Sequence, residues 1–368
     1  MKFIPVAGAT VPLLLAAFLG AALLALVLTP AIRTIARRRG MVDTPNHRRV
    51  NTSPVPRGGG LAVVVAFIAV GGGLTLFRGN LPTMPAPVGV SDGEIGAVFG
   101  GAALAALMGF VDDLLDLRAR WQLLFQLVLA GLAVALGVGV EAISNPFGPD
   151  KIAFGTPFAI AFTVVWIVGM MNSLNFIDGL DGLSTGIALI AALTLGVLSL
   201  TVQVGAPYVS VLCVVLAGAL LGFLRFNFQP ASIFQGTSGV MFVGYTLALL
   251  AILGTAKVAV ALLVLGVPII DTFWVIVRRL LAGRSPFTPD RGHIHHRLLD
   301  VGVGHRGTVL LIYAICASLG VMSLVVSTAT QVYAFLGALV VFGLVLFLLT
   351  QGSSDALESD AYGPGDPP

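Results

Sequence analysis

The chain has 368 residues, of which 57% are hydrophobic and 10% are charged, and its formal net charge is +3. A mean hydropathy of +1.00 excludes a water-soluble globular protein, and nucleic acid is not an expected partner. The apolar stretches are continuous and do not alternate, which favours helices over a β-barrel in the lipid bilayer. The predicted fold class is therefore all-α, a polytopic integral membrane protein.

Eleven apolar segments are long enough to span a bilayer, at residues 11–29, 60–77, 95–111, 121–140, 156–173, 183–202, 207–224, 239–255, 258–277, 308–327 and 331–350. The eighth and ninth are separated only by Gly254 to Lys257, so a merged or re-entrant pair would give ten spans. We expect a single transmembrane domain over residues 1–350. The acidic tail, residues 351–368, is predicted to be disordered.

The distribution of basic residues predicts the orientation. If the segments alternate in direction, 16 of the 20 Lys and Arg residues fall on one side of the membrane. The positive-inside rule makes this side cytoplasmic, which places the N-terminus outside and the C-terminus in the cytoplasm. Residues 11–29 are followed by Arg37, Arg38 and Arg39, a pattern that favours a retained anchor over a cleaved signal peptide.

The first polar segment, DTPNHRRVNTSPVPRGGG, precedes the second span and contains Arg57 followed by three glycines. These glycines could let backbone N–H groups approach a phosphate, or could form a flexible start to the helix. The spacing differs from that of a Walker A loop.

The segment VDDLLDLRAR follows the third span, where a helix that runs inward ends. Carboxylates at a helix C-terminus face the negative end of the helix dipole, so helix stability does not explain them. Asp116 is expected to pair with Arg120 one turn later. Asp112 and Asp113 have no such partner and predict a nearby divalent cation or a cationic substrate group.

The segment NSLNFIDGLDG follows the fifth span and places Asn175, Asp178 and Asp181 at intervals of three residues. On a helix or in a turn, neighbouring members of this set converge. Oxygen ligands of this kind suit Mg²⁺ or Mn²⁺. The alternative is a solvated loop at the membrane surface.

The long loop after the ninth span, RRLLAGRSPFTPDRGHIHHRLLDVGVGHRG, contains six arginines and four histidines. Zinc is a weaker interpretation of His293, His295 and His296, because no cysteines accompany them and Arg291 and Arg297 would repel a cation. Arginine and histidine donors instead predict a site for phosphate oxygens. Alternatively, the arginines only set the topology or contact anionic lipid head groups.

With the predicted topology, all these polar clusters lie on the cytoplasmic side, where one chamber could hold them. A transporter is the competing class of protein, and its mark would be ionisable residues and broken helices near the bilayer midplane. Asp271 is the only acidic residue well inside a predicted span. We expect its carboxylate to form a structural hydrogen bond or a local ion pair.

Four motifs together resemble the polyprenyl-phosphate N-acetylhexosamine-1-phosphate transferase family: DDLLDLRARWQLLFQ, NSLNFIDGLDGLSTGIA, FLRFNFQPASIF and DRGHIHHRLLDVGVGHRGTVLLIY. The resemblance runs from about residue 40 to residue 330. The HIHH sequence is similar to that of the bacterial branch that uses undecaprenyl phosphate and starts cell-envelope glycans such as O-antigen lipopolysaccharide or teichoic acid.

The resemblance implies a phosphotransferase of the bacterial inner membrane, with an active site that faces the cytoplasm. Undecaprenyl phosphate would attack a UDP-N-acetylhexosamine, most simply UDP-N-acetylglucosamine, in a Mg²⁺-dependent reaction that releases UMP. Mn²⁺ could replace Mg²⁺, and a homodimer is compatible with the sequence. The residue patterns and the resemblance together predict the following site: catalytic Asp112, Asp113 and Asp178; metal ligands Asn175, Asp178 and Thr237; and substrate-binding Arg57, Asp181, Arg291, His293, His295 and His296.

One departure from the family pattern concerns the metal. Where the family usually has Gly-Asp-x-Gly-Ser, this chain has Gly236-Thr237-Ser238-Gly239-Val240, so Thr237 replaces a carboxylate ligand. A threonine hydroxyl can also bind Mg²⁺. The alternative is a weak or inactive relative that binds lipid phosphate or a UDP-sugar.

Overall fold

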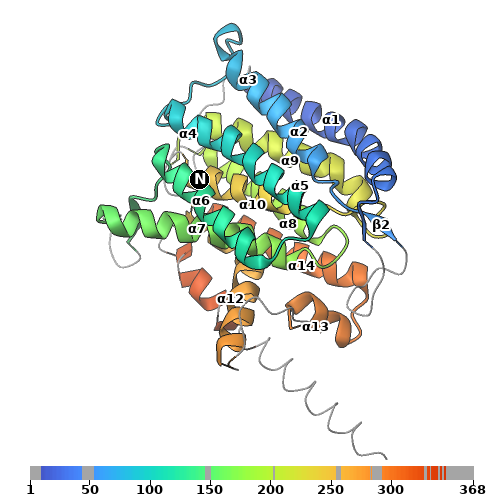
Figure 1. Ribbon diagram of the computed structural model, residues 1–368. Coiled ribbons are helices and arrows are strands. Elements are labelled where there is room, and N and C mark those ends of the chain that lie inside the picture. The colour runs from blue at the N-terminus through green and yellow to red at the C-terminus, as the bar shows by residue number, and fades with distance from the viewer. Residues whose placement is uncertain are drawn as a thin grey trace, which may run out of the picture.

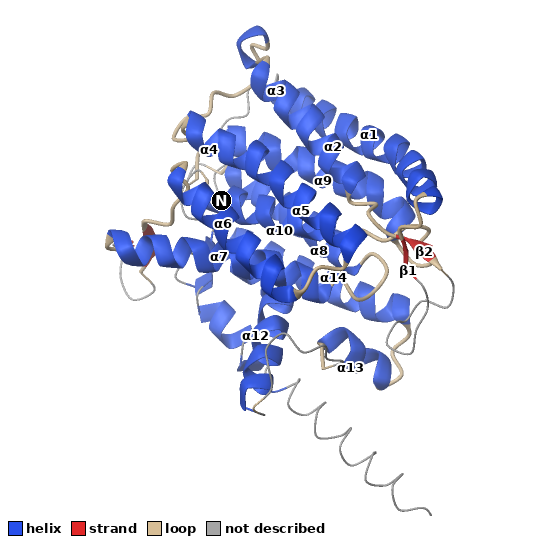
Figure 2. Cartoon of the chain, viewed as in Figure 1, coloured by secondary structure: helices blue, strands red, loops and turns tan. Residues whose placement is uncertain are grey.

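The computed structural model describes residues 10–43, 54–145, 151–201, 204–253, 258–281, 283, 292–326, 330, 331, 333–338, 340, 341 and 344. Regular structure in these residues is almost entirely helical. The exceptions are two short antiparallel hairpins, which pair β1 (Val42–Asp43) with β2 (Val55–Pro56) and β3 (Ala142–Ser144) with β4 (Lys151–Ala153) (Figure 2). The all-α fold class is confirmed. The predicted disordered tail, 351–368, lies outside the described residues.

Most helices coincide with predicted apolar segments, and Figure 1 shows their arrangement. The last predicted span, 331–350, lies in large part outside the described residues. In chain order they are α1 (Thr10–Arg38), α2 (Leu61–Phe67), α3 (Gly73–Leu76), α4 (Asp92–Gly96), α5 (Ala102–Leu115), α6 (Ala119–Ala135), α7 (Thr156–Ile177), α8 (Leu183–Ser199), α9 (Pro207–Asn227), α10 (Gly236–Ile252), α11 (Val258–Val264), α12 (Gly266–Leu281), α13 (Ile294–Asp300) and α14 (His305–Val325). A π-helical turn joins α2 to α3 (Ile68–Gly72) and another joins α4 to α5 (Ala97–Gly101), and a 3₁₀ turn, Arg78–Asn80, follows α3.

Several of these helices have the length and composition of membrane spans. Within the described residues, 5 are long and apolar enough, or 6 if α11 and α12 form one bent span. Four further apolar segments are shorter: Leu61–Leu76, Ala119–Ala135, Leu183–Ser199 and Gly236–Ile252. The multi-pass membrane architecture is therefore confirmed, whereas the count of ten or eleven spans and the orientation of the termini stay predictions.

The ninth predicted span, 258–277, is corrected by the structure. It consists of two helices, α11 and α12, which meet at an angle of 78°. Pro268 lies in the first turn of α12 and cannot donate a hydrogen bond to the carbonyl of Val264, and its ring would clash with that carbonyl in a continuous helix. The chain therefore breaks at Leu265, a position that the apolar composition does not reveal.

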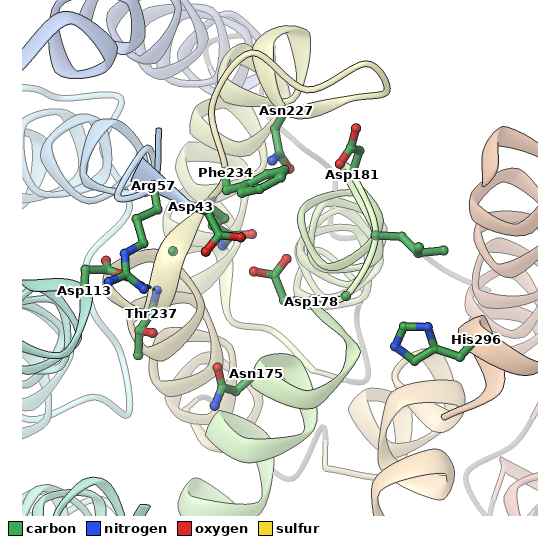
Figure 3. Close-up of a pocket in the computed structure, with 14 residues that line it drawn as sticks. Asp43, Arg57, Asp113, Asn175, Asp178, Asp181, Asn227, Phe234, Thr237 and His296 are labelled. Carbon is green, nitrogen blue, oxygen red and sulfur yellow. Dashed lines mark hydrogen bonds between the residues drawn. The ribbon is translucent and has the colours of Figure 1, made fainter. Parts of the chain in front are cut away.

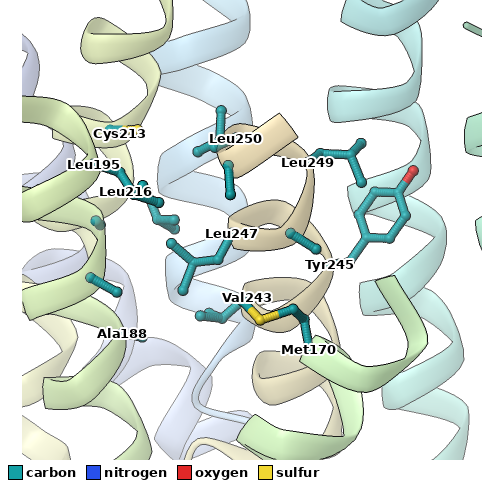
Figure 4. Close-up of a cluster of buried hydrophobic side chains, with 14 of the residues drawn as sticks. Met170, Ala188, Leu195, Cys213, Leu216, Val243, Tyr245, Leu247, Leu249 and Leu250 are labelled. Atoms are coloured by element: carbon teal, nitrogen blue, oxygen red, sulfur yellow. The ribbon is translucent and has the colours of Figure 1, made fainter. Parts of the chain in front are cut away.

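The centre of the bundle is formed by α9 and α10. In α10 every residue from Ser238 to Ile252 is buried, and Figure 4 shows its Val243 and Leu247 with Leu195 of α8 and Leu216 of α9 around them. Because lipid is as apolar as these side chains, close packing holds such helices together more than exclusion from water. A rigid centre of this kind can hold the helix ends in fixed positions.

The contact between α1 and α9 uses two small residues. A methyl group on Gly218 or Gly222 would lie 2.2 Å from the carbonyl oxygen of Phe18 or Ala22, so only glycine permits this approach. Small residues four apart are typical of helices that pack closely in membranes. The opposite face of α1 carries Leu19 and Leu23, which are more than half exposed and suit contact with lipid.

Candidate active site

A polar cavity of about 310 Å³ lies where several helices end (Figure 3). Its lining residues are Asp43, Arg57, Asp113, Asn175, Asp178, Gly179, Leu180, Asp181, Asn227, Phe234, Gln235, Gly236, Thr237 and His296. The predicted meeting of the polar segments in one chamber is thus confirmed for these residues. Asp112, His293 and His295 do not line this cavity, and Arg291 lies outside the described residues.

Asp113 is placed at the cavity by the last turn of α5, and its carboxylate faces the start of α10. Its Oδ1 accepts a hydrogen bond from the backbone N–H of Thr237 at 2.9 Å, and its Oδ2 accepts one from that of Ser238 at 3.1 Å. These N–H groups belong to the first turn of α10, where no backbone partner exists and the helix dipole is positive. The start of α10 therefore stabilises the charge of Asp113 and fixes its orientation.

Asp112 points elsewhere, although it is the neighbour of Asp113. Its Oδ1 accepts hydrogen bonds from the backbone N–H of Leu117 at 3.0 Å and from Gln122 Nε2 at 2.7 Å. These bonds hold the turn that joins α5 to α6. The structure therefore separates the two neighbouring carboxylates, and a role for Asp112 in the reaction stays a prediction.

The predicted ion pair between Asp116 and Arg120 is wrong. The helix ends at Leu115, and Asp116 adopts a left-handed conformation with φ 47°, which removes it from the face shared with Arg120. Its Oδ1 lies 3.0 Å from Arg57 Nη1 instead. This contact links Arg57, a cavity residue, to the end of α5.

The three glycines after Arg57 do not form an anion-binding nest. The N–H groups of Gly59 and Gly60 donate to the carbonyls of Phe234 and Gln235, at 2.9 and 2.8 Å. A methyl group on Gly60 would lie 2.2 Å from the Cα of Gly239. The glycines therefore pack the start of α2 against the start of α10. For this reason they form neither a phosphate nest nor a flexible start to the helix.

Asp178 follows the last residue of α7 and is half-buried at the cavity. The hydroxyl of Ser184 donates to its Oδ1, and the same hydroxyl and that of Thr185 lie 2.8 Å from Gln235 Oε1. Burial raises the pKa of Asp178 to about 7; the Ser184 hydrogen bond opposes this rise, and the charges of Asp113 and Asp181 add to it. A cation between these carboxylates would relieve that repulsion.

Asp181 is held by two elements that the sequence did not connect with it. Its backbone N–H donates to His305 Nε2 at 3.0 Å, and its Oδ2 accepts from the backbone N–H of Ala231 at 2.9 Å. The turn after α7 is therefore tied to the start of α14 and to the loop after α9. His305 was one of four histidines in its loop, but only the other three were assigned to the site.

The histidines of the HIHH sequence divide into two positions. His296 lines the cavity, whereas His293 and His295 are buried beside it, with their rings stacked at 5.7 Å. Neither ring nitrogen of His295 has a hydrogen-bond partner in the described part of the chain. Burial, and then the neighbouring histidines His296, His293 and His305, lower the pKa of His295 well below its ordinary value, so this ring is neutral.

Gly179 makes the position of His295 available. A methyl group at Gly179 would lie 2.2 Å from His295 Nε2. The absence of a side chain lets residues 293–296, called the histidine loop below, pack directly on the backbone between Asp178 and Asp181. The spacing of NSLNFIDGLDG therefore serves two purposes, since its aspartates face the cavity and its first glycine receives the histidine loop.

A Mg²⁺ ion fits the residues of the cavity. Among the described residues, no three His, Cys, Asp or Glu side chains lie together as a metal site. A transition metal such as zinc would favour such a group. Mg²⁺ differs because it binds through one or two carboxylates and keeps waters or phosphate oxygens. Asp113 and Asp178 supply such carboxylates, and Asn175 and Thr237 add neutral oxygens on the same lining.

A second, apolar groove of about 590 Å³ lies between α6, α7, α11 and α12. Its lining includes Leu127, Val165 and Phe273, together with Asn172, Ser173 and Phe176 from the last turns of α7. Asn172 Nδ2 donates to Gln126 Oε1 at 2.7 Å, so this amide joins α7 to α6. The segment NSLNFIDGLDG is thus shared between the groove and the polar cavity.

Several residues at the site escaped the sequence reasoning. They are Asp43, Ser184, Asn227, Gln235 and His305, which line the cavity or hold its carboxylates. Ser184, Asn227 and Gln235 lie within or beside the motifs that resemble the family, but these side chains take part in hydrogen bonds between residues 42 to 51 positions apart. Spacing along the chain gives no signal for such contacts.

Comparisons with known proteins show the family of this chain. Residues 95–255 match the family model described as glycosyl transferase family 4. A probable undecaprenyl-phosphate N-acetylglucosaminyl 1-phosphate transferase of Bacillus subtilis is 34% identical over 354 residues, which cover 95% of this chain and 94% of that protein.

Two further relatives extend the comparison. The decaprenyl-phosphate N-acetylglucosaminephosphotransferase of Mycobacterium tuberculosis is 34% identical over 93% of this chain and 90% of its own length. The undecaprenyl-phosphate alpha-N-acetylglucosaminyl 1-phosphate transferase of Escherichia coli is 26% identical over 79% of this chain and 78% of its own length. The protein therefore belongs to the polyprenyl-phosphate N-acetylhexosamine-1-phosphate transferase family.

Proposed function

We propose that this protein is a transferase that moves N-acetylglucosamine 1-phosphate from a UDP-sugar to a prenyl phosphate, with release of UMP. The relatives named above act on undecaprenyl or decaprenyl phosphate, and identity extends over almost the whole chain. The acceptor phosphate attacks the sugar-bearing phosphorus, a new phosphorus–oxygen bond forms, and the bond to the UMP phosphate breaks. The product is a lipid-linked sugar diphosphate.

This proposal rests on the end of α7, where neighbouring residues line two different cavities. Asn172, Ser173 and Phe176 line the apolar groove, whereas Asn175 and Asp178 line the polar cavity. A prenyl chain suits the groove, and a nucleotide diphosphate suits the cavity. A phosphate attached to that prenyl chain would therefore meet the diphosphate at the end of α7.

The charges of the cavity fit phosphoryl transfer, which depends mainly on positioning and on shielding of charge. Asp113 and Asp178, with Asn175 and Thr237, would hold Mg²⁺, which supplies positive charge to the phosphate oxygens when bound. Arg57 and His296 provide further donors for these oxygens, because both line the same cavity. Asp181 fixes the cavity wall toward the nucleotide through Ala231 and His305.

The distribution of arginines supports a cytoplasmic location of the reaction. We place the cavity at the cytoplasmic face of the bacterial inner membrane, where UDP-sugars are available, and we expect the product to start a cell-envelope glycan such as lipopolysaccharide or teichoic acid. Reaction of a membrane-impermeant thiol reagent with a cysteine introduced at His296 would test the side. Labelling only after the membrane is opened supports the proposal, and labelling of intact cells contradicts it.

The transporter alternative loses its main support. A broken helix and a buried acidic residue do occur together at α11 and α12. However, Asp271 Oδ1 accepts the backbone N–H of Ile294 and Oδ2 lies 2.7 Å from His293 Nδ1, so both oxygens are engaged in structural contacts. The inactive-relative alternative rests only on Thr237, and the identity to the named transferases over most of the chain does not favour it.

The proposal is tested with purified protein, undecaprenyl phosphate, Mg²⁺ and labelled UDP-N-acetylglucosamine. We expect labelled lipid and UMP in equal amounts, and no product after removal of the metal with a chelator. Thr237→Asp should tighten the apparent affinity for Mg²⁺ about 10-fold, because it restores a third carboxylate. Absence of lipid product at all Mg²⁺ concentrations, in the wild type and in Thr237→Asp, would contradict the proposed function.

A further inference from the structure

Asp271 is a buried carboxylate that the proposed reaction does not yet use. It lies on α12, six residues beyond the bend at Leu265, and its exposed fraction is 0%. A charged group is costly in such a position unless partners compensate for it. Its partners come from the histidine loop, which is far away in sequence.

Both oxygens of Asp271 are engaged with this loop. Oδ2 lies 2.7 Å from His293 Nδ1, and Oδ1 accepts the backbone N–H of Ile294 at 2.8 Å. In its ionised form this carboxylate only accepts hydrogen bonds, which places a hydrogen of His293 on Nδ1. Nε2 is then the atom that the ring presents on its other side.

The ring of His293 lies close to both substrate regions. Its centroid is 5.9 Å from that of Phe176, which lines the apolar groove, and 5.7 Å from that of His295, which packs on Gly179 at the cavity wall. The ring therefore lies beside the end of α7, between the place of the prenyl chain and the place of the diphosphate.

We propose that Asp271 is a positioning residue for the transfer, which fixes the ring orientation and the proton of His293 so that Nε2 meets a phosphate oxygen. This inference rests on the proposed function. With Nδ1–H donated to Asp271, a second hydrogen on Nε2 would make the ring an imidazolium, whose positive charge lies between the Asp271 carboxylate and the anionic phosphate. The phosphate belongs either to the prenyl acceptor or to the UDP-sugar.

Asp271→Asn tests this idea with little change in shape. The N–H of Ile294 requires an oxygen opposite it, so the asparagine must direct its NH₂ group toward His293 Nδ1. Nδ1 then has to accept a hydrogen bond, so the ring carries its one hydrogen on Nε2 and cannot be an imidazolium while it keeps this contact. The variant therefore keeps both contacts and the Nε2–H group but loses the hydrogen on Nδ1 and the positive charge of the ring, which separates the proposed role from a purely structural role of Asp271.

The first readout is spectroscopic and needs no substrate. In protein with ¹⁵N-labelled histidine, we expect the His293 signal, assigned by its loss in His293→Gln, to show a protonated Nδ1 in the wild type. In Asp271→Asn we expect an unprotonated Nδ1. A wild-type spectrum with an unprotonated Nδ1 overturns the proposal, and this result is accessible even if Asp271→Asn does not fold.

The second readout is kinetic. We expect Asp271→Asn to lower kcat/KM roughly 10- to 100-fold, the range typical of groups that orient a functional histidine. In the His293→Gln background the same substitution should change kcat/KM less than about 2-fold, because its effect passes through His293. Multiplicative losses in the double variant would show that Asp271 acts only on the fold and would contradict the proposal.

A control and two substrate series complete the experiment. Thr246→Val replaces a buried hydroxyl of α10 that has no partner among the described residues, and it should leave activity and tautomer unchanged. A rise in KM for prenyl phosphate alone assigns the phosphate to the acceptor, and a rise for the UDP-sugar alone assigns it to the donor. If the wild type formed no lipid product, the proposed function would fail, whereas the tautomer would still report on Asp271.

Discussion

The polar cavity and the apolar groove are built from the same helix end but by different means. Four aspartates reach the cavity, and hydrogen bonds from helix starts, hydroxyls and backbone groups hold at least three of them. The groove is lined mainly by Leu, Val, Ile and Phe side chains of α6, α7, α11 and α12, and the bend at Leu265 separates the last two helices. We infer that the chemistry depends on fixed charges, whereas binding of the prenyl chain depends on shape.

The largest expected effect concerns the cavity carboxylates. Asp113→Asn should lower kcat roughly 100-fold or more, because it removes a charge that phosphoryl transfer requires and disturbs the contact with the start of α10. Asp92→Asn is the control, because its exposed carboxylate pairs with Arg78 at 3.9 Å away from the cavity lining, and this variant should lower kcat less than about 2-fold. Activity assays with both purified variants test this prediction. A fully active Asp113→Asn protein would show that Asp113 is not part of the active site.

A smaller loss is expected when the cavity wall is displaced. Gly179→Ala places a methyl group against His295 and should lower kcat/KM roughly 10- to 100-fold through misplacement of the histidine loop. Gly131→Ala on α6 is the control, since a methyl group there meets no atom within 4 Å. Equal activity of the two variants would show that the contact between the loop and the α7 end has no role in transfer.

The pKa of Asp178 predicts how Mg²⁺ binding depends on pH. A carboxyl group with a pKa of about 7 is mostly protonated at pH 6, so the proton must leave before the metal binds. The apparent Mg²⁺ affinity should therefore rise about 10-fold between pH 6 and pH 8. Titrations of the metal at several pH values measure this. A flat profile in the wild type, or an equally steep one in Asp178→Asn, would contradict it.

The smallest effect is expected in the groove. Val165→Trp fills part of its lining and should raise KM for undecaprenyl phosphate roughly 3- to 10-fold, while KM for the UDP-sugar stays constant. The effect is modest because the prenyl chain leaves lipid, which is as apolar as the groove. Leu19→Trp on the exposed face of α1 is the control. If the two variants behave alike, the groove does not hold the acceptor.

Much of the fold was predictable, because continuous apolar composition determines where helices lie in a membrane. The start of α7 at Thr156, of α8 at Leu183 and of α9 at Pro207 agrees with the predicted segments. The bend at Leu265 was missed, because Pro268 lies within an apolar run that has the length of one span. Hydropathy shows where a chain is apolar, but it does not show where a helix changes direction.

The site was predictable in its members and less so in its contacts. Asp113, Asp178 and His296 do meet, as polar residues at one end of several helices should. The predicted partner of Asp116, Arg120, was wrong because Asp116 itself adopts a left-handed conformation at the helix end, which periodicity cannot reveal. The partner of Asp271 was not predicted either, since it lies 22 residues away in a separate helix and loop.

The central claim is that the prenyl chain lies in the groove while its phosphate reaches the cavity around the end of α7. Crosslinking with an undecaprenyl phosphate analogue that carries a photoreactive group on its chain tests this directly. The account predicts labelled peptides from α6, α7 and α12, and loss of this labelling in Val165→Trp but not in Leu19→Trp. Labelling confined to the surface formed by α1 and α9 would contradict it.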